Sequence, residues 1–316
     1  MNNIIVTGGA GFLGSHCVDL LIEKGYHVLI LDDLSFGSEK NLNPNADFIK
    51  MDIGNFETTE EAIVNFNPSH IFHFAANATT KSTSMGWKNP LVDYRINMVG
   101  TLNILESIRK SKLSTHLIYA STAAIYGEPD YIPINEKHVT APLSPYGVSK
   151  LAGEKYCYAY FKEWSVKTTI IRIFNTYGPR QPRYVMYDQM KKILGCEDGN
   201  FKVLGTGEQL RDYAYVSDSV DAFYRVMMQP EKSIGQVFNV AGGNKFSIKD
   251  LIIEIKSVLK REDLQEVFTG ESWKGDLEKL WADTSKIREI LGWEPKVRLR
   301  EGLEILADWI KENEKF

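Results

Sequence analysis

The sequence predicts an α/β protein in which a doubly wound parallel sheet comes first and a smaller mixed α/β lobe follows. Short apolar runs alternate with amphipathic helical segments up to about residue 175, and a glycine-rich turn joins the first run to the first helix. After that point, prolines and glycines break the chain into shorter pieces. Strands that are apolar on both sides are typical of parallel sheets covered by helices on each face. We therefore expect one domain over residues 1–175 and a C-terminal lobe over residues 176–316, interleaved with the first.

The individual elements are predicted from the spacing of apolar residues and from the residues that end each run. Apolar residues at positions 13, 17, 20 and 21, for example, have a helical spacing, and Gly25 ends that segment. The first part has predicted strands at 3–7, 27–31, 47–51, 70–74, 116–120 and 168–173, and predicted helices at 12–24, 57–66, 89–110 and 144–162. The second has predicted strands at 201–204 and 236–240, and predicted helices at 184–194, 217–228, 247–259, 284–291 and 300–313.

Composition excludes several classes of protein. The 316 residues carry 37 Lys and Arg against 41 Asp and Glu, a net charge of −4, which does not favour nucleic-acid binding. No apolar stretch is long enough to span a membrane, and we expect no signal peptide. The cysteines, Cys17, Cys157 and Cys196, are far apart and are expected to be reduced thiols of a cytoplasmic protein. The histidines are scattered, and no metal site is predicted.

The turn after the first strand has the character of a phosphate-binding loop. Its sequence is T-G-G-A-G-F-L-G at residues 7–14, with glycines at Gly8, Gly11 and Gly14. Glycines at this spacing allow a tight turn, a close approach of the backbone to a pyrophosphate, and close packing of helix on strand, as in the Rossmann fold. The next strand ends at Asp32, where a carboxylate can bind adenosine ribose hydroxyls and would repel a 2′-phosphate. The sequence therefore predicts a Rossmann domain that binds NAD.

A second motif suggests general-base chemistry. Tyr146 and Lys150 form a Y-x-x-x-K pair on one face of a predicted helix. A nearby ammonium is expected to lower the pKa of the phenol toward working pH. Tyr158 and Tyr187 begin copies with the same spacing, so the motif alone is not specific. Only Tyr146 follows a predicted strand end with hydroxyl side chains, among them Thr122, at the edge of the sheet where ligands bind.

With these motifs the chain resembles the extended short-chain dehydrogenase/reductase family, specifically its nucleotide-sugar epimerases and dehydratases. The resemblance runs from residue 3 to about residue 303. Besides residues 7–14, it depends on D-D-L at 32–34, D-I at 52–53, F-A-A at 74–76, N-x-x-G-T at 97–101, S-T-x-x-x-Y-G at 121–127, S-P-Y-G-x-S-K at 144–150, F-N-x-Y-G-P-R at 174–180, G-x-G-E-Q-x-R-D-Y at 205–213, G-D at 275–276 and A-D-T-S-K at 282–286. W-K-G-D at 273–276 and V-M-Y-D at 185–188 resemble a subgroup usually labelled UDP-glucose 4-epimerase.

The resemblance implies a role for each matching residue. Asp32 would hold the adenosine ribose, and the residues implied to contact NAD are Gly8, Gly11, Phe12, Leu13, Gly14, Asp32, Asp33, Asp52, Ile53, Ala75, Ala76, Asn97, Tyr146 and Lys150. Thr122, Tyr146 and Lys150 would be catalytic, with Tyr146 as the base. Asn175 and Arg211 would hold the substrate pyrophosphate. The residues implied to contact the substrate are Lys81, Thr122, Tyr146, Asn175, Val203, Arg211 and Asp276.

The residues after Thr122 bear on which reaction follows. Dehydratases that resemble this chain carry Asp-Glu directly after the catalytic Thr, and related decarboxylases carry a Glu at the second position. Here these residues are Ala123 and Ala124, neither of which can move a proton. We therefore expect a 4-epimerase, acting on a UDP-hexose, in which hydride passes from C4 to NAD and returns on the opposite face. A dehydratase or another enzyme that forms a 4-keto sugar, and a non-catalytic NAD-binding protein, are the alternatives.

Three further points stay open at this level. Lys81 could bind an acidic or acetamido substituent of the sugar, or could be an ordinary solvated lysine. Trp273 and Lys274 stand where many relatives carry an arginine for a phosphate. The predicted helices at 89–110 and 144–162 carry more apolar and aromatic residues than one core requires, and relatives pair these helices across a dimer. We therefore expect a homodimer.

Overall fold

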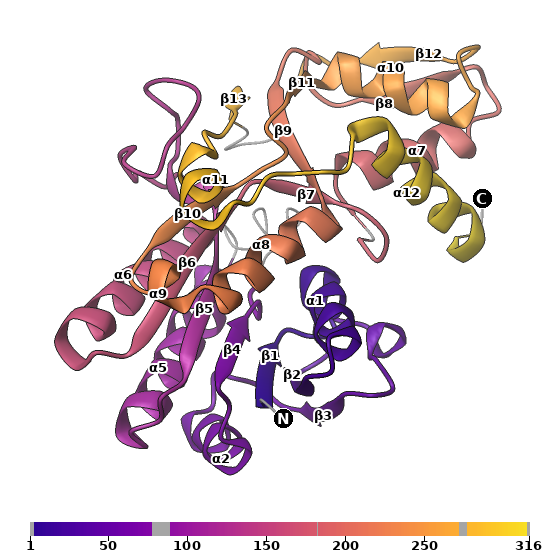
Figure 1. The fold of residues 1–316 in the computed structure, drawn as a ribbon. Helices are drawn as coiled ribbons and strands as arrows, with labels where there is room; N and C mark the ends of the chain where they lie inside the picture. Colours follow the sequence, from indigo (N-terminus) through magenta and orange to yellow (C-terminus); the bar gives the residue numbers. More distant parts are fainter. Residues whose placement is uncertain (1–2, 78–88, 182, 272–276, 315–316) are drawn as a thin grey trace.

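The computed structural model describes residues 3–77, 89–181, 183–271 and 277–314. Its centre is a seven-stranded parallel sheet with the strand order β10-β6-β5-β4-β1-β2-β3 (Figure 1). The strands are β1 (Asn3–Thr7), β2 (His27–Asp32), β3 (Asp47–Lys50), β4 (His70–His73), β5 (His116–Thr122), β6 (Lys167–Ile173) and β10 (Val237–Val240). The order reverses between β1 and β4, and ligands of such sheets bind at this reversal, beyond the carboxyl ends of the strands. The predicted fold class is confirmed.

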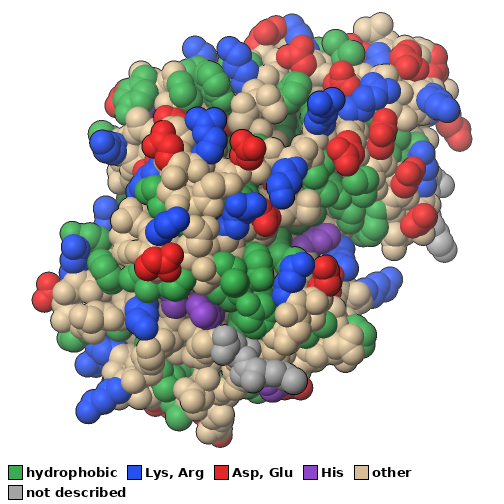
Figure 2. Space-filling view, in the orientation of Figure 1, with side chains coloured by type: hydrophobic (Ala, Val, Ile, Leu, Met, Phe, Trp, Pro, Cys, Tyr) green, Lys and Arg blue, Asp and Glu red, His purple; other side chains and the backbone are tan. Residues whose placement is uncertain are grey.

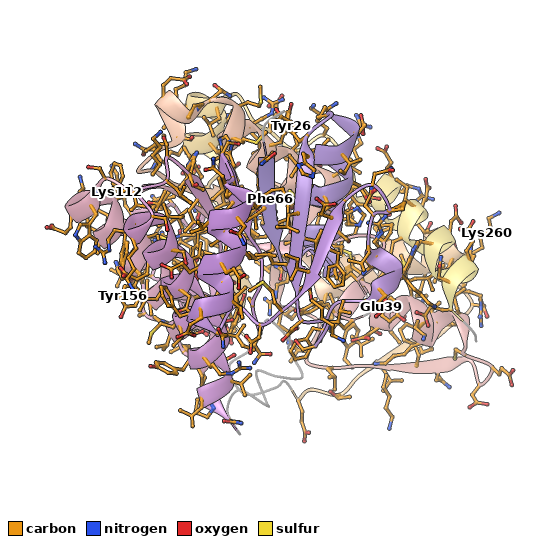
Figure 3. All side chains as sticks on the ribbon, turned by 90° about the horizontal axis from the view of Figure 1, so that it is seen from below. Tyr26, Glu39, Phe66, Lys112, Tyr156 and Lys260 are labelled. Carbon is orange, nitrogen blue, oxygen red and sulfur yellow. The ribbon has the colours of Figure 1, made fainter. Side chains whose placement is uncertain are left out.

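Helices cover both faces of this sheet because its inner strands are apolar on both sides. Ile4 and Val6 point into the core with α1 (Phe12–Glu23) and α8 (Val216–Met228), whereas Ile5 lies in a second core with the opposite helices. Those opposite helices are α2 (Phe56–Phe66), α5 (Gly100–Lys110) and α6 (Pro145–Trp164). Seen from below, Lys112, just after α5, and Tyr156 on α6 lie on one side of the molecule, and Lys260, at the end of α10 (Ile248–Leu259), lies on the other (Figure 3).

Local sequence explains where several helices begin and end. Ser144 accepts a hydrogen bond from the backbone N–H of Gly147 at 3.1 Å, and Pro145 occupies the first turn of α6. Asn55 caps α2 in the same way, through the N–H of Thr58 at 3.0 Å. These caps provide partners for N–H groups that have none within the helix.

The prediction of one regular helix over residues 89–110 was wrong in one respect: the helical segment is interrupted by a π-helical turn. The segment starts at α4 (Pro90–Asp93), continues through a π-helical turn, η2 (Tyr94–Val99), and ends with α5. The hydroxyl of Thr101 donates to the carbonyl of Asn97 at 2.6 Å, which is the acceptor that a regular helix would offer to the N–H four residues on. Turns of this kind are frequent at functional sites.

The C-terminal part contributes two small sheets and a group of helices. One sheet joins β7 (Asn175–Tyr177), β9 (Leu210–Tyr215), β11 (Lys245–Ser247) and β13 (Lys279–Leu280), and the other joins β8 (Asn200–Val203) and β12 (Gln265–Phe268). Three helices pack together beside them: α7 (Val185–Leu194), α10 (Ile248–Leu259) and α12 (Leu299–Asn313) (Figure 1). The short helical elements are η1 (Glu39–Asn41), η3 (Ala123–Ile125), α9 (Pro230–Ser233) and α11 (Ser285–Leu291).

One predicted strand has an unexpected place. The strand expected at 236–240 is β10, and it pairs with β6 in the main sheet and not with a strand of the C-terminal part. Of the strands in the smaller sheets, only β8 was predicted, at 201–204. The division into domains at residue 175 stays a prediction.

The distribution of charged side chains on the surface is consistent with the small net charge of the chain. Acidic and basic side chains are interspersed over the face shown in Figure 2. Within the described ranges, no helix is long and apolar enough to cross a membrane. Cys17 and Cys157 are buried as free thiols, and Cys196 is a partly buried free thiol.

Candidate active site

The glycine-rich turn leaves no room for side chains. Gly8 has a φ of +72°, its N–H donates to the carbonyl of Leu31 at 2.8 Å, and a Cβ on it would lie 2.6 Å from the backbone nitrogen of Ala75. A Cβ on Gly14 would overlap the carbonyl oxygen of Gly8. Helix α1 then starts at Phe12 without a side-chain cap or an acidic residue in its first turn. The backbone N–H groups in the first turn of α1 are therefore open to an anion. The glycine-rich turn and this helix start fit the pyrophosphate of a dinucleotide.

The carboxylate of Asp32 lies beside this turn. Its two oxygens accept hydrogen bonds from the backbone N–H groups of Ala10, at 3.0 Å, and Leu34, at 2.8 Å. Burial raises the pKa of Asp32, and these two hydrogen bonds act in the opposite direction. Because a carboxylate has more acceptor sites than these bonds use, Asp32 can still receive ribose hydroxyls. Asp33, in contrast, accepts hydrogen bonds from the N–H and hydroxyl of Ser35.

Asp52 and Ile53, which the resemblance implies contact NAD, have a neighbour that no sequence motif identified. Asp52 accepts the N–H of Gly54 at 2.8 Å and forms an ion pair with Arg95, which comes from the π-helical turn η2. Ile53 is buried against Gly100. No motif singles out Arg95, because its contact with Asp52 depends on how η2 packs beside the end of β3.

Three further residues implied to contact NAD, Ala75, Ala76 and Asn97, lie near the carboxyl end of β4. Ala75 donates its N–H to the hydroxyl of Thr7 at 3.3 Å, and Ala76 follows it in the chain. Asn97 is fully buried and accepts the N–H of Asn77 at 2.8 Å. The structure therefore brings the end of β4, the end of β1 and the π-helical turn together.

The predicted catalytic side chains meet where β5 ends and α6 begins. Thr122 is the last residue of β5, and its side chain lies close enough to the phenol of Tyr146, in the first turn of α6, to lower the pKa of that phenol. The Thr122 hydroxyl also accepts the N–H of Ala124 at 3.2 Å. Glycine is required at Gly147, because a Cβ there would lie 2.7 Å from the carbonyl oxygen of Ala124. This contact keeps the start of α6 close to the end of β5.

The electrostatic expectation for Tyr146 needs correction. The sequence predicted that Lys150 would lower the pKa of this phenol, but burial is the largest effect and raises it. A nearby phenol, Tyr184, raises the pKa further, the hydroxyl of Thr122 lowers it, and the charge of Asp93 raises it. Lys150 is itself buried, which lowers the pKa of its ammonium to about 7.

The substrate residues implied by the resemblance lie in the smaller sheets. Asn175, at the start of β7, donates to the carbonyl of Asp212 at 3.2 Å, and Arg211, on the adjacent β9, donates to the carbonyl of Leu210 at 2.8 Å. These two residues therefore lie on adjacent strands, where Asn175 is paired in register with Tyr213, two residues beyond Arg211. Val203 is buried at the end of β8. Lys81, Trp273, Lys274 and Asp276 lie outside the described residues.

Two residues that no motif identified also belong to this site. Tyr184 precedes α7 with a φ of +77°, and Asp93 ends α4. Both influence the pKa of Tyr146. The placement of Asp93 depends on the packing of α4 on α6, and that of Tyr184 on the path of the chain before α7; local spacing reveals neither.

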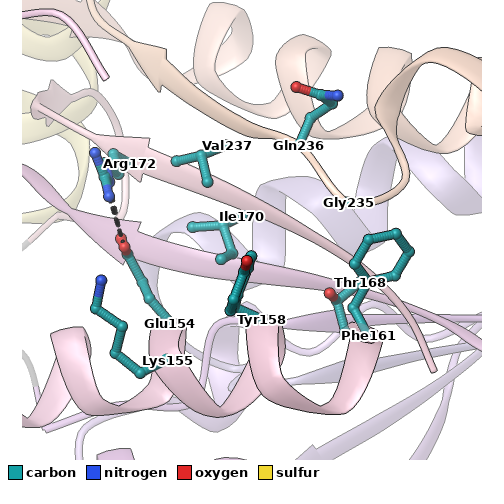
Figure 4. Close-up of a pocket in the computed structure, with 10 residues that line it drawn as sticks. All are labelled: Glu154, Lys155, Tyr158, Phe161, Thr168, Ile170, Arg172, Gly235, Gln236 and Val237. Carbon is teal, nitrogen blue, oxygen red and sulfur yellow. Dashed lines mark hydrogen bonds and ion pairs between the residues drawn. The ribbon is translucent and has the colours of Figure 1, made fainter. Parts of the chain in front are cut away.

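A small cleft lies between α6 and the strands β6 and β10 (Figure 4). It is lined by Tyr158 and Gln236 and by an ion pair between Arg172 and Glu154, at 2.8 Å. Its volume is about 90 Å³, and none of the predicted site residues lines it. Because small-molecule pockets have volumes of roughly 300 Å³ or more, this cleft is too small for a nucleotide sugar.

Comparison with known proteins places the chain in a family. The family model described as GDP-mannose 4,6 dehydratase matches residues 5–306. A putative UDP-glucose 4-epimerase of Methanocaldococcus jannaschii is 36% identical over 320 residues, 99% of each chain. The UDP-glucose 4-epimerase of Thermotoga maritima, solved with UDP-glucose, has a TM-score of 0.91 at 37% identity and covers 98% of this chain and 99% of its own.

A third relative was solved with both a nucleotide sugar and NAD. The UDP-glucuronic acid 4-epimerase of Bacillus cereus, solved with UDP-glucuronic acid and NAD, has a TM-score of 0.88 at 31% identity over 98% of this chain and 99% of its own. The glycine turn, the uncapped α1 and Asp32 fit the same dinucleotide in this chain. The chain therefore belongs to the extended short-chain dehydrogenase/reductase family, among its NAD-dependent nucleotide-sugar epimerases and dehydratases.

Proposed function

We propose that this chain is a 4-epimerase of nucleotide sugars and that its substrate is a UDP-hexose. The observation that carries the proposal is the turn after Thr122. The hydroxyl of Thr122 contacts Tyr146, while the next two side chains, Ala123 and Ala124, are methyl groups that cannot move a proton. Removal of water from the sugar requires an acid and a base besides Tyr146, whereas epimerisation does not.

The residues of the site have distinct roles in this reaction. Tyr146 takes the proton of the sugar O4 as a 4-keto sugar forms, and gives it back when O4 is restored. Thr122 holds the same oxygen through its hydroxyl. Lys150 binds the nicotinamide ribose, and Asn175 with Arg211 holds the substrate pyrophosphate. NAD, when bound, accepts the hydride from C4 and returns it to the opposite face of the sugar. Since NAD is regenerated in every cycle, net oxidation does not occur.

The test offers the purified protein a panel of UDP-sugars deuterated at C4. The panel contains UDP-glucose, UDP-galactose, their N-acetyl forms and UDP-glucuronate. The products are separated by chromatography, and their masses are measured by mass spectrometry. We expect one C4-epimeric pair to reach the same mixture from either side, with unchanged mass and deuterium still at C4. A product that has lost water would exclude the epimerase and favour the dehydratase. No conversion of any sugar by the NAD-loaded protein would favour a non-catalytic role.

A matched pair of variants tests the proposed base. Tyr146→Phe is expected to lower kcat by at least about 100-fold, because general-base catalysis contributes that much or more. Tyr158→Phe removes a hydroxyl from the same helix and from the same Y-x-x-x-K spacing, but Tyr158 is 57% exposed and is expected to have no effect. Normal turnover in Tyr146→Phe would exclude the proposed base.

We also propose that the protein is a homodimer. Large apolar side chains are exposed on the helices that run from α4 to α6: Leu91, Tyr94, Val148, Tyr158 and Trp164. Exposed apolar surface of this kind is typical of association sites. Sedimentation equilibrium at micromolar concentration should give twice the mass of the chain, and Val148→Glu should reduce it. A monomer mass for the unmodified protein would contradict the proposal.

A further inference from the structure

A buried carboxylate and a buried amide form a pair beside Tyr146 that the proposed mechanism does not use. Asp93, the last residue of α4, is 1% exposed, and Asn77, four residues after β4, is 3% exposed. The side-chain amide of Asn77 donates to one carboxylate oxygen of Asp93 at 2.8 Å. The other oxygen of Asp93 and the side-chain oxygen of Asn77 have no hydrogen-bond partner in the part of the chain that the structure describes. A buried charge that is only partly satisfied costs stability, so a purely structural role does not explain it.

Hydrogen bonds run from this pair into the catalytic helix. The backbone N–H of Asn77 donates to the side-chain oxygen of Asn97 at 2.8 Å, and the amide of Asn97 donates to the hydroxyl of Ser149 at 2.9 Å. That hydroxyl in turn donates to the carbonyl of Tyr146 at 2.8 Å. The chain of contacts thus joins α4, the end of β4, the π-helical turn η2 and the first turns of α6. Ser149 directly precedes Lys150, so both proposed catalytic residues on α6 adjoin this chain.

The charge of Asp93 also acts on the Tyr146 phenol. Burial raises the pKa of Asp93, and the hydrogen bond from Asn77 lowers it. The groups that face Tyr146 come from several elements: Thr122 on β5, Tyr184 before α7 and Asp93 on α4. Lys150 lies on the same helix. A reversible epimerase needs a phenol that both takes and returns a proton, which requires a balance between positive and negative charges around it.

We propose that Asp93 is a positioning residue for Tyr146. Through Asn77, Asn97 and Ser149 it fixes the first turns of α6 against the end of β4, and its negative charge offsets the positive charge that a bound nicotinamide would bring near the phenol. The inference rests on the proposed role of Tyr146 as the base, and it assigns to Asp93 no contact with the sugar.

Asp93→Asn separates charge from shape. The variant keeps a carbonyl oxygen that can accept from Asn77 but removes the negative charge. The readout is the ζ-carbon resonance of Tyr146 in NAD-loaded protein labelled with carbon-13 tyrosine, which is assigned by its absence in Tyr146→Phe. We expect the titration of this resonance, and the acid limb of the pH profile of kcat, to move to lower pH. Asp308→Asn, on the exposed face of α12, should move neither.

Asp93→Leu tests the hydrogen-bond chain. Loss of the contact with Asn77 frees the first turns of α6, and we expect kcat to fall between about 10- and 100-fold, because small misplacements of a catalytic group cost that much. KM should stay nearly unchanged, because Asp93 does not touch substrate. If Asp93→Leu does not fold, Asn77→Ala interrupts the same chain and should give the same split between kcat and KM.

The outcomes are distinct. An unchanged Tyr146 titration in Asp93→Asn, or an unchanged kcat in the variant that interrupts the chain, would overturn the inference. A merely structural Asp93 would lower thermal stability without moving the titration. If the unmodified protein converts no UDP-sugar while the Tyr146 titration still moves in Asp93→Asn, the epimerase proposal fails and the link between Asp93 and Tyr146 stands.

Discussion

The ammonium of Lys150 lies 4.2 Å from the centre of the Tyr119 ring, at a place where the lysine side chain is almost wholly buried. The hydroxyl of Tyr119 in turn donates to the carbonyl of Lys150 at 3.2 Å. Burial lowers the pKa of Lys150 to about 7, and the nearby Cys157 and Glu154 act in the opposite direction with smaller effect. The folded protein therefore holds a cation that it would be more stable without.

Lys150→Met is expected to stabilise the NAD-free protein near neutral pH while it removes activity. The folded chain releases the Lys150 proton near pH 7, whereas the unfolded chain keeps it up to the ordinary value of 10.5. Below pH 7 the folded wild type carries the whole cost of burying the charge. Between pH 7 and 10.5 the unfolded state binds more protons than the folded one, so wild-type stability rises with pH across that window.

Urea unfolding at a series of pH values measures this effect. The advantage of Lys150→Met should be a few kcal/mol at about pH 7, since one unit of pKa shift corresponds to about 1.4 kcal/mol, and should shrink toward pH 10.5. Lys155→Met, at an exposed position on the same helix, is the control and should show no such pH dependence. A variant less stable than wild type at neutral pH would contradict the prediction.

Gly14→Ala should disrupt the dinucleotide site. The added Cβ overlaps the carbonyl oxygen of Gly8, so α1 must move away from the turn. We expect the Kd for NAD, measured by calorimetry, to rise at least about tenfold, because the N–H groups at the start of α1 no longer point at the bound pyrophosphate. Gly25→Asn is the control: Gly25 has a φ of +80° with nothing within 4 Å of a Cβ, and Asn tolerates this conformation. Wild-type NAD affinity in Gly14→Ala would refute the assignment of the turn.

At position 184, a glycine variant is expected to be more stable than an alanine variant, which is the reverse of their usual order in a helix. Its φ of +77° and ψ of 168° favour glycine strongly. Tyr184→Gly and Tyr184→Ala lose the same ring, so their difference isolates the backbone, and the glycine variant should be more stable by about 1 kcal/mol or more. At Tyr187, inside α7, the order should be the normal one, with alanine more stable by about 1 kcal/mol. Chemical denaturation of the four variants provides the comparison.

The ion pair of Arg172 and Glu154 should be costly to break singly. Both side chains are buried and contact each other (Figure 4). Arg172 also donates to the hydroxyl of Tyr126 at 2.9 Å. Arg172→Met leaves an unpaired buried carboxylate and should lower the free energy of unfolding by about 3–5 kcal/mol. The double variant with Glu154→Leu should regain part of this loss.

Arg300→Ala is the control for that ion pair. Arg300 lies 3.5 Å from Glu254 and 3.3 Å from Glu304, with all three side chains exposed, so its loss should cost less than about 1 kcal/mol. Equal effects of Arg172→Met and Arg300→Ala would show that burial does not govern the first pair.

Sequence patterns predicted the central sheet well, because most of its strands are short apolar runs that are buried on both faces. The edge strand β3, which is largely exposed, is the exception. The patterns failed for β9, whose residues include Arg211 and Asp212 and whose pairing partners, β7, β11 and β13, are distant in the chain. Strand formation in such segments depends on long-range pairing more than on local preference.

The residues of the site likewise divide into those with a local sequence motif and those placed by long-range packing. The glycine turn and the Tyr146–Lys150 pair have fixed local spacings, so a single sequence is enough to find them. Asp93 and Arg95 carry no motif, because each acts through a partner, Asn77 or Asp52, that reaches it only when η2 packs beside the sheet. The direction of the Tyr146 pKa shift could not be predicted either, since the extent of burial is a property of the whole fold.

The position of β10 has a consequence for how the chain folds during synthesis. Until residue 240 has left the ribosome, β6 is an edge strand that pairs with β5 on one side and is open on the other, although every other strand of the sheet has already been made. Open edges of this kind invite pairing with other chains. A nascent chain stopped anywhere between β6 and β10 should therefore aggregate or engage chaperones, and the protein should acquire its protease resistance in a single late step.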